Sequence, residues 1–295
     1  MLNECIVGLD IKPDGIYVDL TYGGGGHSKE IISRLGPEGH LYGFDQDNDA
    51  KNGAMRDDRF TFVHSNFRFV ANWMQFYKVE GVDGILADLG VSSHHLDDGE
   101  RGFSFRYDAF LDMRMNRNSR LTAHDIVMEY PEDRLADIMF LYGELKQSRR
   151  IAAEITKHRK QEDIKTTGQL ADIVAPLLGR EREKKDMARI FQALRIEVNE
   201  EMKALEEMLE AATSILKSGG RLAIITYHSL EDRIVKNFIR DSGNRNGNDD
   251  RDSLIYGYSS SRLKDVGKGI TIPSEEEIRN NQRSRSAKLR IAEKR

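Results

Sequence analysis

Residues 15–29, GIYVDLTYGGGGHSK, decide the fold, because they pass from an apolar strand pattern through four glycines into a helical pattern. Ile16, Tyr17 and Val18 form the short apolar run of a buried strand. Ser28 can cap the helix that follows. Glycine has no Cβ, so the backbone between this strand and this helix can approach a ligand closely. The pattern predicts a nucleotide-binding corner.

A second strand pattern, residues 40–44, ends in Asp45, about 20 residues past the last glycine, where such folds place an acid for ribose hydroxyls. The dinucleotide fingerprint fails, because Ser28 or Lys29 stands where a third small residue is needed. A Walker phosphate loop fails too, because Lys29 has no Gly before it and no Ser or Thr after it. S-adenosylmethionine, which has an adenosine but no phosphate, best suits Asp19, the glycines and Asp45. A glycine-rich turn without a ligand is the alternative.

The composition excludes several classes of protein. A chain of 295 residues forms one large domain or two intimately joined ones. Cys5 is the only cysteine, which excludes a disulfide framework and a cysteine-based zinc site and predicts a cytoplasmic protein. No apolar run reaches the length of about 20 residues that spans a bilayer, and the start has no signal-peptide pattern. The histidines lack a zinc-deaminase pattern, so we expect no metal.

Charge is distributed unevenly, although the formal net charge is only −4. Residues 1–100 carry more acidic than basic side chains, whereas residues 101–120 and 279–295 are strongly basic. Such a distribution predicts a basic face suited to a polyanion.

Strand and helix patterns alternate along the chain. Residues 59–64, 82–90 and 222–227 read as the third, fourth and fifth strands, with helical patterns between them. Residues 286–292 could supply a closing strand, and residues 241–268, rich in Gly, Asn, Asp and Ser, predict a mobile loop. The alternation predicts an α/β fold, a parallel sheet with helices on both faces.

Asn66 and Phe67 follow the third strand directly. The carboxyl ends of the strands line the ligand crevice in such a sheet, so these two side chains are candidates for the edge and the face of an adenine. Phe67 could equally fill the hydrophobic core.

The middle of the chain changes to a helical period. Thr122 marks a helix start, and residues 113–187 are predicted to form an all-helical insertion. The main domain then comprises residues 1–112 and 188–295. A long amphipathic helix over residues 191–216 returns the chain to the sheet.

Residues 89–106 resemble neither strand nor helix, and a long irregular segment in a compact domain is usually functional. This region and its continuation interleave basic with aromatic side chains: Arg101, Phe103, Phe105, Arg106, Tyr107, Arg114 and Arg117. The mixture is typical of proteins that hold phosphates while stacking bases, and the basic helix at residues 147–160 could add phosphate contacts. A solvated loop over tucked aromatics is the alternative.

Six blocks of sequence, in one order, carry a resemblance over nearly the whole chain. They are residues 17–21 with 25–28, 88–93, 101–105 with 111–115, 191–196 with 198–199, 228–233 and 285–290. The chain resembles the bacterial small-subunit (16S) ribosomal RNA cytosine-N4-methyltransferase family. The resemblance implies a Rossmann-like class I S-adenosylmethionine-dependent methyltransferase whose helical insertion recognises rRNA. It implies methylation of a decoding-region cytidine, cytosine 1402 in conventional rRNA numbering, in the small ribosomal subunit.

The resemblance also implies which residues form the site. Its cofactor contacts fall on Gly25, Gly26, His27, Asp45, Phe67 and Asp88. The family usually has Pro-Gln where His94 and His95 stand, so His95 would replace the glutamine as a cofactor contact. On the substrate side we expect Arg101, Arg106 and Arg114 to hold phosphates. We expect Phe103 or Phe105 to shelter a flipped base.

Asp88 is the candidate catalytic residue. The cytosine amine is a poor nucleophile because its lone pair is delocalised into the ring, so the enzyme should supply a proton acceptor. Asp88 could instead only position the methionine amine of the cofactor. A small-molecule methyltransferase would leave the arginine-aromatic segment unexplained. A non-catalytic ribosome-assembly factor that binds S-adenosylmethionine and rRNA is the remaining alternative.

Overall fold

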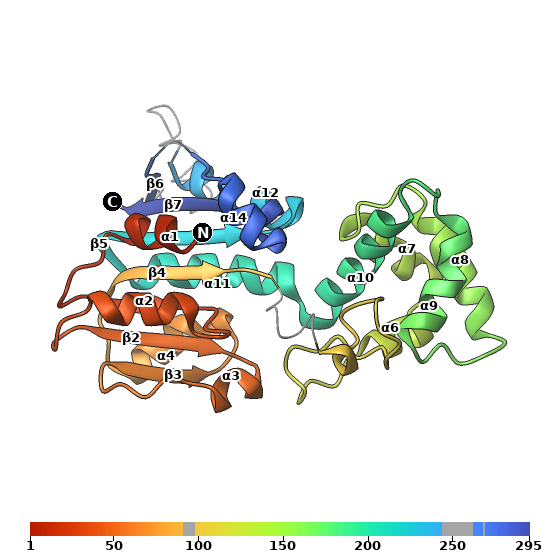
Figure 1. Cartoon of the computed structure of the whole chain (residues 1–295), viewed down its shortest axis with the longest axis horizontal. Helices are drawn as coiled ribbons and strands as arrows, with labels where there is room; N and C mark the ends of the chain where they lie inside the picture. The colour runs from red at the N-terminus through yellow and green to blue at the C-terminus, as the bar shows by residue number, and fades with distance from the viewer. Residues whose placement is uncertain (91–97, 244–261, 268) are drawn as a thin grey trace, which may run out of the picture. The chain divides into compact units, whose positions relative to one another are not determined.

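The chain folds into two compact units, and Figure 1 colours them by residue number. Unit 1 comprises Met1–Gly90 and Met202–Arg295, and unit 2 comprises Val91–Glu201. Unit 2 is therefore an insertion between two parts of unit 1. The computed structural model describes residues 1–90, 98–243, 262–267 and 269–295.

The predicted limits of the insertion, residues 113–187, are wrong at both ends. Phe103 and Leu111 precede that range, and Phe191 and Leu194 follow it, yet all four are buried in the hydrophobic core of unit 2. The insertion needs these side chains to complete its core, so the division falls at the flanking residues and not at 112 and 188.

Unit 1 is built on a seven-stranded sheet with the order β3-β2-β1-β4-β5-β7-β6. Neighbours among β1 to β5 pair in parallel, and β7 runs antiparallel to both β5 and β6. This Rossmann-like α/β arrangement confirms the predicted fold class, and β7 confirms the predicted closing strand. The strands are β1 Ile16–Asp19, β2 His40–Asp45, β3 Phe60–His64, β4 Val82–Asp88, β5 Leu216–Thr226, β6 Leu263–Asp265 and β7 Lys288–Lys294.

Helices cover both faces of this sheet (Figure 1). Val18 and Ile85 pack in the core with α4, α11 and α12, whereas their neighbours Tyr17 and Leu86 pack on the other face with α1 and α2. Each such side chain contributes roughly 1.5–3 kcal/mol by leaving water. The helices of unit 1 are α1 Leu2–Leu9, α2 Gly26–Arg34, α3 Asn48–Asn52, α4 Val70–Phe76, α11 Glu201–Ile215, α12 Ser229–Gly243 and α14 Glu275–Asn280.

Unit 2 is a helical unit. The Thr122 hydroxyl accepts a hydrogen bond from Asp125 N–H, and the Asp125 carboxylate accepts one from Thr122 N–H, which confirms the predicted helix start. No helix in the described ranges is long and apolar enough to cross a membrane. The helices of unit 2 are α6 Ala123–Glu129, α7 Glu132–Leu141, α8 Ser148–Arg159, α9 Thr167–Val174 and α10 Glu183–Asn199.

The long helix predicted over residues 191–216 is broken at Glu200. This residue has left-handed backbone angles, φ 49° and ψ 38°, so α10 ends at Asn199 and α11 begins at Glu201. The apolar period continues through the break because it serves two cores. Leu194 packs in unit 2, and Leu205 packs against the sheet of unit 1.

Candidate active site

Three carboxylates lie at one edge of the sheet. Asp19, Asp45 and Asp88 are the last residues of β1, β2 and β4, which are parallel neighbours. Parallel strands bring their carboxyl ends to the same edge, and open α/β sheets bind ligands in the crevice outside that edge. The structure therefore places the three acids in the crevice where the sequence predicts a ligand.

Asp19 holds the two ends of the glycine loop together. Its Oδ1 accepts a hydrogen bond from Thr21 N–H at 3.1 Å, and its Oδ2 accepts one from the Ser28 hydroxyl at 2.6 Å. Asp19 is only 1% exposed, and burial raises its pKa although His27 and Ser28 oppose the rise. Both carboxylate oxygens are engaged within the loop, so Asp19 shapes the site.

The glycines leave bare backbone beside the crevice. Gly25, the N-cap of α2, has a φ of 75°, and a Cβ there would lie 2.7 Å from the Tyr22 hydroxyl. A Cβ at Gly24 or Gly26 would meet nothing within 4 Å. The chain thus needs glycine at 25 for its own conformation, and it leaves open space beside 24 and 26.

Asp45 is tied to the same loop. Its Oδ2 accepts a hydrogen bond from Gly23 N–H at 2.9 Å, and its Oδ1 accepts one from Asp47 N–H at 2.9 Å. Asp45 therefore lies at the carboxyl edge beside the glycine loop, where such folds place the acid for ribose hydroxyls.

Asp88 lies between Tyr227 and His27. The Tyr227 hydroxyl donates to Asp88 Oδ1 at 2.9 Å, His27 Nδ1 lies 3.7 Å from Asp88 Oδ2, and Asp88 N–H donates to Thr21 Oγ1 at 2.7 Å. Burial raises the pKa of Asp88, and the nearby Asp19 adds to the rise, while His27 and Tyr227 lower it. The Asp88 carboxylate is therefore a stronger base than an exposed aspartate.

A cavity of about 230 Å³ lies next to the side chains of Asp88 and His27. Its lining includes Gly26, His27, Asp88, Ile225 and Tyr227, all in unit 1. His27 Nε2 is buried and has no hydrogen-bond partner among the residues that the structure describes. A buried polar nitrogen beside a cavity is unfavourable unless a ligand or water pairs with it.

Comparison with known proteins identifies the family. The family model described as MraW methylase family matches residues 1–295, the whole chain. The chain belongs to the MraW methylase family. This membership confirms the family resemblance found in the sequence and makes the protein a methyltransferase.

Relatives of this MraW methylase match it from end to end. Ribosomal RNA small subunit methyltransferase H of Phocaeicola vulgatus is 58% identical over 295 residues, covering 100% of this chain and 96% of its own length. The protein of the same name from Christiangramia forsetii is 51% identical over 294 residues, covering 100% and 96%. A solved rRNA methylase structure from Streptococcus thermophilus aligns over 99% of this chain and 94% of its own, with 11% identity and a TM-score of 0.41.

The residues predicted to bind the cofactor of the methylase come together in unit 1. Gly26, His27 and Asp88 line the cavity, and Gly25 is the N-cap of the helix that begins at Gly26. Asp45 lies at the same edge of the sheet and is tied to the glycine loop through Gly23. Phe67 begins the short 3-10 helix after β3, where it is half-buried against the core. The Asn66 amide donates to Gln46 Oε1, and its oxygen caps this turn. His95 lies outside the described residues.

The predicted RNA contacts at Arg101 and Phe103 are wrong. Arg101 is 1% exposed, and its Nη2 donates to the carbonyls of Arg114 and Met115 at 2.9 and 3.3 Å. Phe103 is 6% exposed and belongs to the core of unit 2, with the Arg101 guanidinium 5.7 Å from its ring centroid. Neither side chain presents a surface to a phosphate or a base.

Arg114 is also occupied within the methylase. Its guanidinium pairs with both carboxylate oxygens of Asp112 at 2.7 and 2.9 Å. Phe105 is half-buried, with its ring edge-on to Phe191 at a centroid distance of 5.5 Å. Arg106 alone of the five predicted RNA contacts is exposed.

Sequence reasoning missed Tyr227 as a site residue. It follows β5 directly, so it lies at the carboxyl edge that also carries Asp88. The carboxyl ends of parallel strands line the ligand crevice, and this reasoning applies to residue 227 as well. Glu231 accepts hydrogen bonds from the N–H groups of Tyr227 and His228, so it fixes the turn that presents the tyrosine.

Proposed function

We propose that this methylase transfers the methyl group of S-adenosylmethionine to N4 of a decoding-region cytidine in 16S rRNA, cytosine 1402 in conventional numbering. The observation that carries the proposal is the match, 58% identical across 295 residues, to a relative named ribosomal RNA small subunit methyltransferase H. Because the match spans both units, we assign the same class of substrate to this protein. It then acts in the cytoplasm on the small ribosomal subunit.

The crevice fits S-adenosylmethionine through three features. Asp45 ends β2 beside the glycine loop, where such folds place an acid for ribose hydroxyls. The backbone at Gly24 and Gly26 is open to a ligand, and His27 Nε2 is a buried atom that needs a partner. When bound, the donor supplies an electrophilic methyl group on a positively charged sulfur. The proposed contacts are Gly25, Gly26, His27, Asp45, Phe67, Asp88 and His95.

Different residues of the crevice would bind the ribose, the adenine and the methionine part of the donor. Asp45 accepts hydrogen bonds from the ribose hydroxyls, and the exposed part of the Phe67 ring packs against the adenine face. With its proton on Nε2, His27 would donate a hydrogen bond to the methionine carboxylate, which would give that nitrogen a partner. The crevice needs no phosphate-binding group.

Asp88 acts as the proton acceptor for the cytosine amine. The amine nitrogen would gain the methyl group as the carbon–sulfur bond of the donor breaks and its electron pair stays on the sulfur. The amine would then lose a proton to Asp88, whose raised pKa favours accepting it. The Tyr227 hydroxyl holds Oδ1, which leaves Oδ2 on the side of His27 as the accepting oxygen. Asp88 thus combines a fixed orientation with increased basicity.

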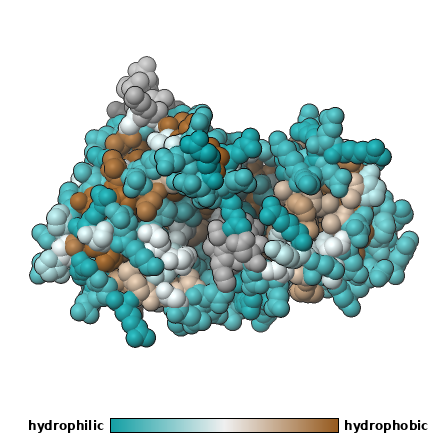
Figure 2. Space-filling model, viewed as in Figure 1, coloured by the Kyte–Doolittle hydropathy of each residue, from teal (hydrophilic) through white to brown (hydrophobic). Residues whose placement is uncertain are grey.

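Basic side chains of unit 2 supply contacts to rRNA phosphates. Arg106 is exposed, α8 carries three exposed basic side chains, Arg149, Arg150 and Lys157, and the exposed Lys160 follows it directly. Figure 2 shows that hydrophilic residues cover much of the visible face. Binding through such contacts weakens steeply as the salt concentration rises. Phe105, which is partly exposed, is the remaining candidate for stacking on the flipped base.

The test incubates purified protein and methyl-labelled S-adenosylmethionine with intact small subunits and, separately, with free 16S rRNA. Nucleosides are then released and identified by mass spectrometry. The proposal predicts labelled N4-methylcytidine from the small subunits. Label in another nucleoside would contradict the assigned target, and rRNA binding without any labelled nucleoside would favour a non-catalytic assembly factor.

A further inference from the structure

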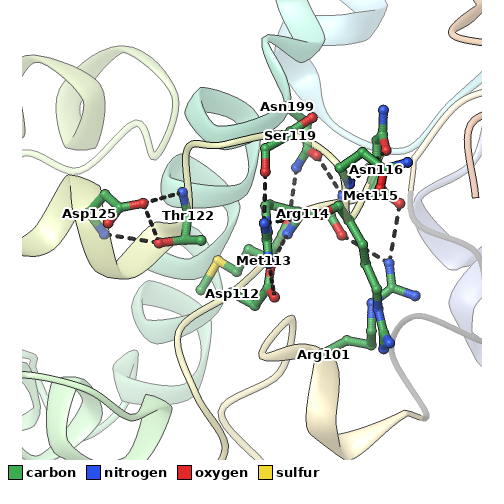
Figure 3. A network of polar contacts seen from close by, with 12 residues as sticks. Arg101, Asp112, Met113, Arg114, Met115, Asn116, Ser119, Thr122, Asp125 and Asn199 are labelled. Atoms are coloured by element: carbon green, nitrogen blue, oxygen red, sulfur yellow. Dashed lines mark hydrogen bonds and ion pairs between the residues drawn. The ribbon is translucent and has the colours of Figure 1, made fainter.

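Residues 112–122 in unit 2 form a segment without helix or strand whose backbone is held by side-chain hydrogen bonds. The side chain of Asn199, the last residue of α10, holds its first part (Figure 3). Asn199 Oδ1 accepts from Met115 N–H at 2.8 Å, and Nδ2 donates to the carbonyls of Met113 and Arg195, each at 2.8 Å. One amide therefore fixes both sides of residue 114.

The buried guanidinium of Arg101 supports the same segment from the protein interior. The Arg101 Nη2 group donates to the carbonyls of Arg114 and Met115, and the side chain is 1% exposed. Burying a charge costs several kcal/mol unless hydrogen bonds compensate. The carbonyls at 114 and 115 contribute that compensation, so the position of this backbone is coupled to the burial of Arg101.

Arg114 extends the support to the far end of the segment. Its Nη1 donates to the carbonyls of Arg117 at 3.1 Å and Ser119 at 2.7 Å, while Asp112 holds the rest of the guanidinium (Figure 3). Asn116 Oδ1 accepts from Asn118 N–H at 3.0 Å. The inward-facing carbonyls at 117 and 119 are thus anchored to a side chain that is itself fixed.

Residues 117–120 form the exposed part of the segment, and we call them the tip loop. Its side chains Arg117, Asn118, Ser119 and Arg120 are all exposed. They comprise two guanidinium groups, an amide and a hydroxyl, with no carboxylate. The Arg117 guanidinium lies 3.9 Å from Asp98, and its side chain is 55% exposed, so this surface ion pair is weak and can be exchanged.

Such a loop is costly to order. Fixing each residue costs about 1–2 kcal/mol of backbone entropy, and the tip loop recovers little of this by burial. An ordered polar loop is favourable for binding, because a partner then need not order it. Guanidinium groups match phosphates, while amides and hydroxyls pair with base edges and ribose hydroxyls.

We propose that the tip loop is a pre-organised recognition site for rRNA. Arg117 and Arg120 bind phosphates, and Asn118 and Ser119 read the adjacent base edges or riboses. Arg101, Arg114 and Asn199 act only by positioning the loop. The inference rests on the proposed rRNA substrate and specifies which surface of unit 2 recognises it.

The test compares two charge-removing pairs. Arg117→Gln/Arg120→Gln alters the tip loop, and Arg180→Gln/Lys184→Gln removes the same charge from exposed side chains elsewhere in unit 2. Binding of naked 16S rRNA is measured over a series of salt concentrations. We expect the tip-loop pair to weaken binding about ten- to hundredfold and to reduce the salt slope by about 1.5 to 2. The control pair should change affinity by less than about threefold.

Two results would overturn the inference. Equal losses in both pairs would mean that only total charge matters. Unchanged binding to naked rRNA, together with weaker methylation of small subunits, would mean that the loop contacts a ribosomal protein. Methylation by the unaltered protein and its affinity for S-adenosylmethionine are measured alongside. If the unaltered protein methylates small subunits, the proposed function stands whichever way the loop variants behave.

Discussion

Tyr227→Phe removes a single hydroxyl from the site and leaves the ring in place. That hydroxyl donates to Asp88 Oδ1 at 2.9 Å, and it is partly buried beside the cavity. The substitution therefore tests whether the ionised form of Asp88 depends on its hydrogen-bond partner. It does not alter the glycine loop or Asp45.

The expected size of the effect follows from the bond that is lost. A hydrogen bond to a charged group contributes about 1.5–3 kcal/mol, so the preference of Asp88 for its ionised form should fall about ten- to hundredfold. Burial already raises the pKa of Asp88, and the tyrosine opposes that rise, so its loss raises the pKa further. Protonated Asp88 cannot accept a proton from the cytosine amine, so the variant should lose activity at low pH and recover it as the pH rises.

The assay is single-turnover methylation of small subunits at saturating S-adenosylmethionine across a pH series. Asp19, His27 and Cys5 also face Asp88, but they are unchanged in the variant. The difference between the two profiles therefore reports Asp88. We expect the acidic limb of the variant to shift to higher pH and its plateau to approach that of the unaltered protein. Superimposable acidic limbs, or an equal loss at every pH, would refute the reasoning.

Three further predictions concern stability. The raised pKa of Asp88 means that ionising its carboxyl group destabilises the folded protein. This cost is absent below the ordinary aspartate pKa and is fully present once the pH has risen through the raised pKa. Asp88→Asn, which cannot ionise, should therefore increase Tm at neutral pH and not in acid. Calorimetric scans that show the reverse order would contradict the cost of ionisation. Gly25→Ala should destabilise the protein by about 1–2 kcal/mol, because of its positive φ and the contact with Tyr22, whereas Gly24→Ala should be tolerated. Equal melting temperatures for the two alanine variants would disprove the conformational requirement. Asn199→Ala should lower the free energy of unfolding by about 1–3 kcal/mol in urea titrations, because buried backbone groups lose their partners. An unchanged midpoint would mean that the amide does not support the segment.

The sheet could be predicted because its signals are local. Apolar runs that end in Asp19, Asp45 and Asp88 identify three parallel strands, and parallel pairing then brings the acids to one edge without any knowledge of side-chain positions. The glycines, Asp45 and Phe67 follow from that edge and from the glycine loop. The family resemblance added His27 and Asp88 as cofactor contacts, because their neighbours in the sequence do not reveal that role.

The RNA-facing residues could not be predicted in the same way. A sequence that mixes arginine with aromatic residues can form an exposed loop or a buried support for the backbone, and the pattern does not distinguish the two. The carbonyls that accept hydrogen bonds from Arg101 lie 13 and 14 residues further along the chain. Tyr227 and Asp88 are separated by 139 residues, so their hydrogen bond has no local signal. These contacts depend on tertiary packing that no period in the sequence encodes.

The break at Glu200 has a similar origin. Glutamate is a good helix former, and the apolar spacing continues on both sides of it, so intrinsic preference favours a continuous helix. The chain instead adopts a left-handed residue where the core of unit 2 ends and that of unit 1 begins. Packing of two separate cores overrides local preference there.

The most direct test of Asp88 as the proton acceptor is single-turnover methylation by Asp88→Asn with labelled S-adenosylmethionine and intact small subunits. Affinity for S-adenosylmethionine is measured by calorimetry on the same preparation. We predict that methyl transfer falls about 10²- to 10⁴-fold while the cofactor still binds. Full transfer by the variant would contradict the account, and loss of cofactor binding would mean that the lost activity reflects the contact of Asp88 with the donor.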